Sequence, residues 1–258
     1  RMDSEQKRRI LDAHMHLPVQ GKSLPEKKEI LLKEMQKNGI DEGIVISDSA
    51  ITSEIGSLKD CLELFSDTCN VHVVGEISPF FNYKEQCKLL DTALSEKKIV
   101  GIKLFCGHES FYLSDNILEP VYALAETYNV PMLFHSEKDS SQYASYFAVC
   151  EAVRQHPNIT FVCCHCHYPN VEACFQRYKN VNNIVFDISS IADVQMTADM
   201  RKAVQSELQR HPDAIMFGSD YAGCSQADHL EFAMSLAVSD DIQSRLLYKT
   251  AYRVFHLA

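Results

Sequence analysis

Short apolar runs rich in β-branched residues alternate with longer stretches of helical periodicity along almost the whole chain. A short apolar run followed by an amphipathic helix is the repeating unit of a parallel sheet with crossover helices. Eight such runs occur, at residues 10–14, 42–47, 71–78, 100–105, 131–135, 160–165, 184–188 and 214–219. The pattern therefore predicts eight parallel strands.

Helices are expected after these strands, at residues 25–38, 58–68, 83–97, 116–129, 141–156, 169–179, 196–210, 226–238 and 240–255. Gly39 suits the end of the first helix, and Asp115 suits the N-cap of the fourth. Eight strand–helix repeats without a long linker predict an α/β fold, a single (β/α)8 TIM barrel with an extra C-terminal helix. An open doubly wound sheet is the structural alternative, but the first strand lacks the glycine-rich phosphate turn typical of it.

The bulk properties agree with one large domain. A chain of 258 residues, 46% of them hydrophobic, suits a barrel domain at residues 10–258 behind a lead-in at residues 1–9. The net charge of -10 disfavours non-specific binding to nucleic acid or anionic membranes. No apolar run reaches the roughly 18 residues that a membrane span needs. We therefore expect a small-molecule substrate as partner, and homo-oligomerisation is compatible with the sequence.

The ten cysteines bear on the compartment. The first nine residues are charged and lack the apolar core of a signal peptide. Free thiols in a reducing cytosol are therefore the expected state, and we predict a cytoplasmic protein.

Polar residues stand at the ends of the predicted strands, which is where TIM barrels carry their active sites. The first run ends in His14-Met15-His16, and the last is followed by Asp220. The fourth run carries Lys103, the fifth ends at His135 and the sixth at His165. Nitrogen and oxygen ligands of this kind suit zinc or a similar divalent ion.

The spacing of His14 and His16 has a physical reason, because alternate residues of a strand point to the same face. An HxH pair is weak evidence by itself, and the chain has a second one at His165 and His167. The joint occurrence of polar residues at five strand ends is stronger evidence. Each interrupts an apolar run, where an unpartnered polar group costs about 1–3 kcal/mol.

These segments resemble the amidohydrolase superfamily, in particular its amidohydrolase-2 branch. The similarity extends from Asp12 to Phe255, although Lys249-Thr250 stands where the family often has an asparagine. The segments that carry it are residues 11–16, 100–104, 130–135, His165, residues 186–189, 217–220 and 251–255.

The resemblance implies a divalent metal, with zinc favoured and manganese as an alternative, as one ion or two. It implies that His14 and His16 bind the buried ion, and that Asp220 completes that site and acts as general base towards metal-activated water. It makes His135 and His165 ligands of the same ion or of a second one, with His165 also catalytic. Lys103 is either a carboxylated ligand that bridges two ions or a substrate-binding lysine.

Several further positions have open interpretations. His108 and Glu109 lie in the loop after strand four, where substrate contacts belong, although a solvated loop is the alternative for them. Glu76, on strand three, is a weaker candidate for a role at the mouth of the barrel. Asp187 either orients a histidine ligand or touches substrate.

The cysteine-rich run at residues 163–167 resembles a thiolate metal site, but strand alternation places Cys164 and Cys166 on the face opposite His165. Buried cysteines usually act as small hydrophobes, so we do not expect a thiolate site there. His167 is a candidate for lining the pocket.

The sequence thus predicts a metal-dependent hydrolase acting on an amide, ester, lactone or phosphoester of a small polar substrate. A metal-dependent decarboxylase or hydratase on the same scaffold is the alternative. A TatD-like nuclease would normally carry a glutamate where Lys103 stands. A non-catalytic barrel that binds a small molecule is the hypothesis from another class.

Overall fold

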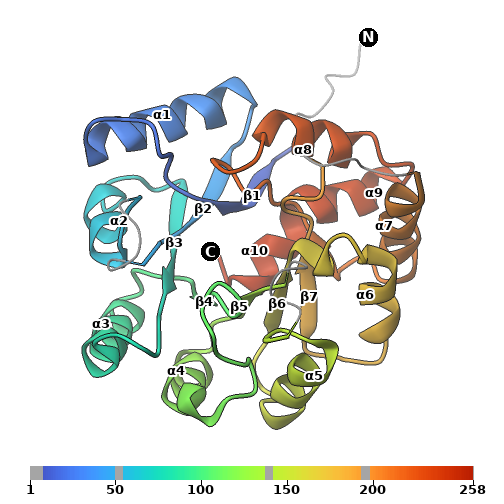
Figure 1. The fold of residues 1–258 in the computed structure, drawn as a ribbon. Coiled ribbons are helices and arrows are strands. Elements are labelled where there is room, and N and C mark those ends of the chain that lie inside the picture. Colours follow the sequence, from blue (N-terminus) through green and yellow to red (C-terminus); the bar gives the residue numbers. More distant parts are fainter. Residues whose placement is uncertain (1–7, 50–54, 137–141, 193–197, 258) are drawn as a thin grey trace.

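The computed structural model describes residues 8–49, 55–136, 142–192 and 198–257, and these form a (β/α)8 barrel. Eight parallel strands follow one another around a ring in chain order, and the helices surround them (Figure 1). The fold prediction is therefore confirmed. The strands are β1 (Leu11–Met15), β2 (Glu42–Ile46), β3 (Val71–Glu76), β4 (Gly101–Leu104), β5 (Met132–His135), β6 (Phe161–Cys164), β7 (Ile184–Asp187) and β8 (Ile215–Met216).

The helices follow the predicted order, and all but α1 are shorter than predicted. They are α1 (Leu24–Lys37), α2 (Leu58–Leu64), α3 (Tyr83–Ser95), α4 (Glu119–Tyr128), α5 (Tyr146–Gln155), α6 (Val171–Arg177), α7 (Ala198–Arg210), α8 (Gln226–Met234), α9 (Asp240–Ser244) and α10 (Thr250–Val254). Two 3₁₀ segments, η1 (Asn116–Leu118) and η3 (His165–His167), and a π-helical segment, η4 (Arg245–Lys249), complete the set. The predicted lead-in and the predicted starts of α5 and α7 fall largely on residues outside the described ranges.

Local signals placed several helix ends correctly. Gly39 follows the C-cap of α1 with a φ of 70°, a left-handed conformation that glycine adopts at little cost. The Asp115 side chain accepts a hydrogen bond from the backbone N of Ile117, 3.0 Å away, and so caps η1. The segment predicted as one helix at 240–255 is instead divided among α9, η4 and α10.

All strands except β1 are shorter than predicted, and the early ends of β6 and β8 bear on the site. β6 ends at Cys164 because His165 turns out of the strand with a φ of 71°. β8 ends at Met216, and the next backbone N, that of Phe217, donates to the carbonyl of Leu246 instead of continuing the ladder with β7.

The segment after β8 closes the ring by bonding to β1. The backbone N of Ala13 donates to the carbonyl of Phe217 at 3.0 Å, and that of Asp220 donates to the carbonyl of His14 at 2.8 Å. The backbone N of His16 donates to the carbonyl of Tyr221. This seam brings the residues that follow the last strand against the end of the first.

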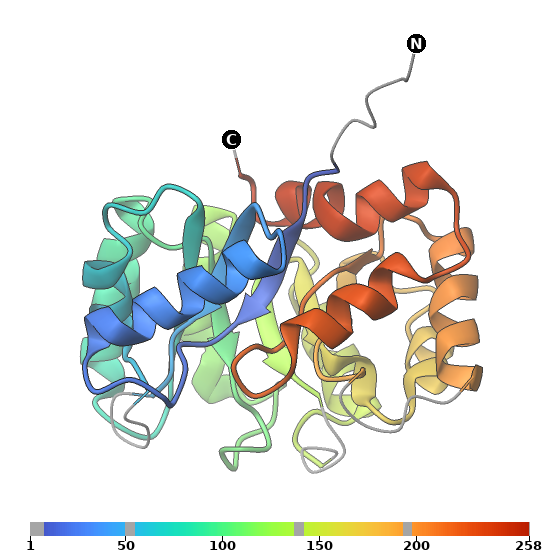
Figure 2. The same cartoon turned by 90° about the horizontal axis from the view of Figure 1, so that it is seen from above.

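The barrel interior is a packed apolar core, built from Leu11, Ile44, Val74, Leu133, Val162, Val185 and Met216 with Val254, Phe255 and Leu257 of the C-terminal segment. The C-terminal helices cover the end of the barrel at which the strands begin (Figure 2). The candidate site lies at the opposite end of the barrel, where the strands finish. Within the described ranges, no helix is both long and apolar enough to cross a membrane.

Candidate metal centre

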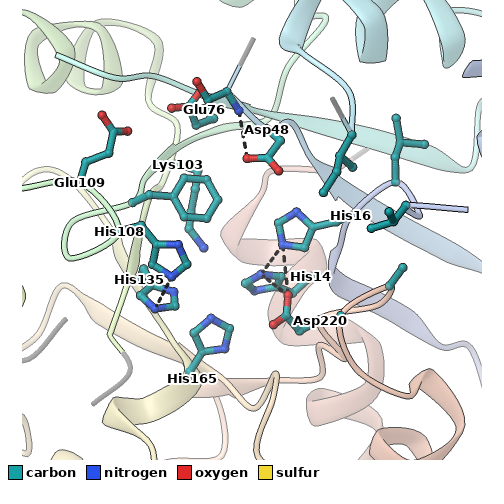
Figure 3. Close-up of a pocket in the computed structure, with 17 residues that line it drawn as sticks. His14, His16, Asp48, Glu76, Lys103, His108, Glu109, His135, His165 and Asp220 are labelled. Carbon is teal, nitrogen blue, oxygen red and sulfur yellow. Dashed lines mark hydrogen bonds and ion pairs between the residues drawn. The ribbon is translucent and has the colours of Figure 1, made fainter. Parts of the chain in front are cut away.

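A cavity of about 470 Å³ opens at the C-terminal ends of the strands. Its wall brings together side chains from β1, β3, β4, β5, the turn after β6 and the segment after β8 (Figure 3). The titratable residues that line it are His14, His16, Asp48, Glu76, Lys103, His108, Glu109, His135, His165 and Asp220. The residues predicted as metal ligands therefore share one cavity.

Three ligand atoms converge at the seam between β1 and the segment after β8. The Nε2 atoms of His14 and His16 lie 3.2 Å apart. Oδ1 of Asp220 lies 3.3 Å from the first and 3.1 Å from the second. The other oxygen of Asp220, Oδ2, accepts a hydrogen bond from Oγ of Ser190 at 2.6 Å. Asp220 reaches this position with a φ of 64°, a strained conformation for an aspartate.

The carboxylate of Asp187 and the hydroxyl of Ser189, both buried, contact the Nδ1 atoms of His14 and His165. Nδ1 of His14 donates to Oδ2 of Asp187 at 3.0 Å. Oγ of Ser189 lies 3.1 Å from the same nitrogen and 2.8 Å from Nδ1 of His165. Asp187, Ser189 and His14 are fully buried. Once Nε2 of His14 is deprotonated, as metal binding requires, the proton held on Nδ1 leaves the lone pair of Nε2 directed at the cavity, which is the arrangement of a metal-binding histidine.

The electrostatics of the cluster separate the charged groups from the neutral ones. Burial lowers the pKa of His14, but the negative charge of Asp187 raises it well above its usual value. Burial raises the pKa of Asp220, but the charge and hydrogen bond of His14 hold it well below the usual range. Burial also lowers the pKa of His165 to about 4 and the pKa of His135 well below its usual value. His135 and His165 are therefore neutral imidazoles at neutral pH, the form that binds metal.

His135 lies beside His165 and His108. The ring centroids of His135 and His165 are 4.9 Å apart, and Nε2 of His135 lies 3.1 Å from Nε2 of His108. His108 comes from the loop after β4 and is more exposed than the other histidines of the cavity. The cavity thus holds five imidazole rings around one space.

Lys103 is fully buried on β4 and lines the same cavity. Its Nζ lies 3.4 Å from Sγ of Cys164 and 4.8 Å from the ring centroid of Phe105. A buried amine at this position can donate a hydrogen bond to a substrate oxygen or, once carboxylated, bind a metal ion.

The donor set suits a divalent cation. Two imidazole nitrogens and a carboxylate oxygen lie within 3.3 Å of one another, with His135 and His165 across the cavity. Such a group of nitrogen and oxygen donors fits zinc or manganese. His14, His16 and Asp220 would hold the ion most closely.

The comparisons with known proteins agree with this geometry. Residues 85–257 match a family model described as amidohydrolase, Amidohydro_2. The chain belongs to the amidohydrolase-2 family. No curated protein matches the sequence.

Three solved structures illustrate the shared fold of this amidohydrolase. An uncharacterised TIM-barrel protein of Bordetella bronchiseptica is 18% identical with a TM-score of 0.79, over 96% of this chain and 98% of that one. A 5-carboxyvanillate decarboxylase of Novosphingobium aromaticivorans, complexed with manganese, is 13% identical with a TM-score of 0.70, over 98% and 97%. A "probable 2-pyrone-4,6-dicarboxylic acid hydrolase" of Acinetobacter baumannii is 13% identical with a TM-score of 0.69, over 96% and 99%.

The turn after β6 directs the rings of His165 and His167, the second HxH pair, to different places. His165, Cys166 and His167 all have positive φ values, 71°, 51° and 51°. His165 lines the cavity, whereas Nε2 of His167 bonds the hydroxyl of Tyr178 at 2.7 Å, and the cavity wall as described does not include His167. The prediction that Cys164 faces away from His165 was wrong. Cys164 lies against Lys103 in the barrel interior, because alternation stops where the chain leaves the strand.

Cys163, His167 and Cys174 form a separate buried cluster in the amidohydrolase. Their ligand atoms lie within 4.8 Å of one another. Burial raises the pKa of the Cys163 thiol, but its contacts with Cys174 and His167 outweigh this effect and lower the pKa to about 5. The sequence argument did not anticipate this grouping, because Cys174 lies on α6 and joins the strand residues only in the folded chain.

Sequence reasoning assigned no role to Ser189, Ser190 or Asp48. Ser189 and Ser190 follow β7 after Ile188 and contact His165 and Asp220, and Asp48 follows β2 and lines the cavity. The rule that polar residues after barrel strands face the active site would have found all three. Small hydroxyl residues are so common in loops that this signal was not distinctive.

Proposed function

We propose that this amidohydrolase is a metal-dependent hydrolase that acts on an amide, ester, lactone or phosphoester of a small polar substrate. The observation that carries the proposal is the convergence of Nε2 of His14, Nε2 of His16 and Oδ1 of Asp220 within 3.3 Å. Zinc is the favoured ion, and the manganese bound by the decarboxylase neighbour makes that metal the first alternative.

A divalent cation supplies Lewis acidity, which makes water more acidic and polarises the bond under attack. Asp220 supplies the base. Its low pKa keeps the carboxylate ionised, and the bond from Ser190 holds Oδ2 while Oδ1 faces His14 and His16. The carboxylate can therefore accept a proton from water at the centre of the cluster.

His165 and Lys103 complete the machinery from the opposite wall. The contacts of Ser189 with Nδ1 of His165 orient its ring, so that a neutral imidazole meets the reacting group. The amine of Lys103 supplies a donor at the floor of the cavity, where it either binds a substrate oxygen or, once carboxylated, bridges a second ion.

A decarboxylase on the same metal centre is the second candidate. The solved neighbours include three structures described as 5-carboxyvanillate decarboxylases and two described as 2,6-dihydroxybenzoate decarboxylase. Asp48, Glu76 and Glu109 also line this cavity and would repel a dicarboxylate such as 5-carboxyvanillate, which disfavours that decarboxylase substrate but not a monocarboxylate. The net charge of -10 and the presence of Lys103 disfavour a nuclease.

Metal analysis and one substitution test the proposal. Protein produced with added zinc or manganese should hold at least one ion per chain, and a panel of lactones, esters, amides and phosphodiesters should identify a hydrolysed class. Asp220→Asn should keep the circular dichroism of the parent and lower turnover about 10²–10⁴-fold. Less than about a tenth of an equivalent of metal, or full turnover by Asp220→Asn, would overturn the proposal. Release of CO₂ without hydrolysis would establish the decarboxylase instead.

A further inference from the structure

One end of the cavity is acidic. Asp48 follows β2, Glu76 ends β3 and Glu109 lies in the loop after β4, so three neighbouring strands each contribute a carboxylate to the wall. Figure 3 shows the three at one end of the cavity, with His135, His165 and Asp220 at the other. The acidic end therefore lies away from His135, His165 and Asp220.

Glu76 is buried without compensation. Glu76 is only 7% exposed, and its Oε1 has no hydrogen-bond partner among the described residues. Its backbone N donates to Oγ of Ser47 at 2.8 Å, which fixes the strand end and with it the direction of the side chain. A buried carboxylate oxygen without a partner costs about 1–3 kcal/mol or more, and this cost falls when a ligand donates to it.

The lysines and arginines of the described residues do not neutralise the acidic end. Within the four described ranges, no lysine or arginine forms an ion pair with Asp48, Glu76 or Glu109. Glu109 accepts a hydrogen bond from Oγ of Ser78, and Asp48 accepts one from the backbone N of Ser49 at 3.0 Å. Lys103 is held lower in the cavity, against Cys164 and Phe105.

The three carboxylates also act on one another. Burial, followed by the charges of Glu109 and Asp48, raises the pKa of Glu76 to about 8. At neutral pH Glu76 therefore holds a proton, and a positive charge placed among the three groups favours release of that proton and relieves their mutual repulsion. An anionic group at the same place would be repelled by them.

We propose that the acidic end of the cavity, formed by Asp48, Glu76 and Glu109, binds a positively charged ammonium or guanidinium group of the substrate. This inference rests on the proposed function, because the bond to be broken must then lie at His14, His16 and Asp220. The substrate class is therefore a small molecule with a cationic group at one end and a hydrolysable polar group at the other.

Matched pairs of small acids test the charge preference without knowledge of the substrate. The zinc-loaded protein is titrated calorimetrically with 4-aminobutanoate and succinate, 5-aminopentanoate and glutarate, and 6-aminohexanoate and adipate. Each pair has the same number of carbons and differs in carrying an ammonium or a second carboxylate at the far end. The amino acid of at least one pair should bind about tenfold or more tightly than its diacid.

Two variants locate the effect. Glu76→Gln should abolish the preference for the amino acid, whereas Glu172→Gln, on the exposed face of α6, should retain it. Equal binding within every pair, tighter binding of the diacids, absence of binding by all three amino acids, or an unchanged preference in Glu76→Gln would overturn the inference.

Metal content separates this inference from its alternatives. If Glu76→Gln loses one metal equivalent relative to the parent, the acidic end holds an inorganic ion and the inference is wrong. If the parent protein binds no metal, the proposed function fails, but the same titrations on the metal-free protein still report the charge preference of the acidic end.

Discussion

Nδ1 of His14 donates to Oδ2 of Asp187 at 3.0 Å in a fully buried contact between β1 and the end of β7. The two residues are 173 positions apart in the chain. The carboxylate fixes both the protonated nitrogen and the orientation of the ring, and so directs Nε2 at His16 and Asp220. The metal centre therefore depends on a residue that does not itself line the cavity.

Asp187→Asn should weaken metal binding about 10–100-fold, because an amide holds the His14 ring less firmly than a carboxylate does. Competition with a chromogenic chelator measures the affinity. Asp213→Asn is the matched control, since Asp213 pairs with Arg245 on the surface and its loss should leave metal affinity unchanged. Equal affinity of Asp187→Asn and the parent would show that the contact does not support the centre.

Asp12→Ala should lower the free energy of unfolding by about 2–4 kcal/mol, because Asp12 ties β1 to the segment after β8. Its carboxylate accepts from the backbone N and the hydroxyl of Ser219, at 3.0 and 2.5 Å, and from Nε2 of Gln226 at 2.8 Å. Urea unfolding measures the effect. Asp67→Ala, which removes an exposed pair with Lys28, should lose less than about 1 kcal/mol. Similar losses in the two variants would contradict a special role of Asp12.

His167→Phe should reduce stability without reducing turnover. Nε2 of His167 bonds the Tyr178 hydroxyl, and its ring lies 4.6 Å from that of Tyr146, so its contacts belong to the outer core. We expect a loss of about 1–3 kcal/mol in thermal or urea unfolding, and Tyr178→Phe should show part of it. A His167→Phe protein with parental stability but little turnover would instead place this histidine in the substrate site.

Glu76→Gln should change how stability depends on pH. The folded protein raises the pKa of Glu76 from its usual 4.5 to about 8, so the folded state retains a proton that the unfolded chain has released. Stability of the parent therefore falls as pH rises from about 4.5 to about 8, and this group causes no further loss above that range. The glutamine side chain carries no charge in either state.

The variant and the parent should thus be equally dependent on pH below pH 4, and the variant should gain about 3–6 kcal/mol relative to the parent by pH 8.5. Urea unfolding in the presence of a chelator, at several pH values, measures the difference. Glu172→Gln, with an exposed carboxyl group, should follow the parent at every pH. A stability difference that does not vary with pH would mean that Glu76 ionises normally in the folded protein.

Much of the candidate site could be placed from the sequence because barrel strands end at one common edge. His14, His16, Lys103 and His135 lie within strands or next to them, so their position at that edge follows from periodicity alone. Asp220 was also found by this rule, although the strand before it is only two residues long. Its contact with His14 and His16 depends on the seam bonds, which no local pattern reveals.

The two HxH pairs have the same spacing but different positions in the folded chain. In β1 the backbone stays extended up to Met15, and the rings of His14 and His16 meet the same carboxylate. At His165 and His167 three successive residues adopt positive φ, and the rings separate into the cavity and the outer core. Identical spacing thus has two outcomes, because alternation holds only while the backbone is extended.

The sequence by itself determined the eight strand–helix repeats and the edge at which the polar residues gather. Both follow from hydrophobic periodicity and from the rule that parallel strands end together. Only the tertiary structure decided that Asp187 orients His14, that Asp220 crosses the seam to meet His16, and that Glu76 is buried beside other carboxylates. These contacts join strands distant in the chain, so they depend on ring closure and on strained turn conformations that no short segment encodes.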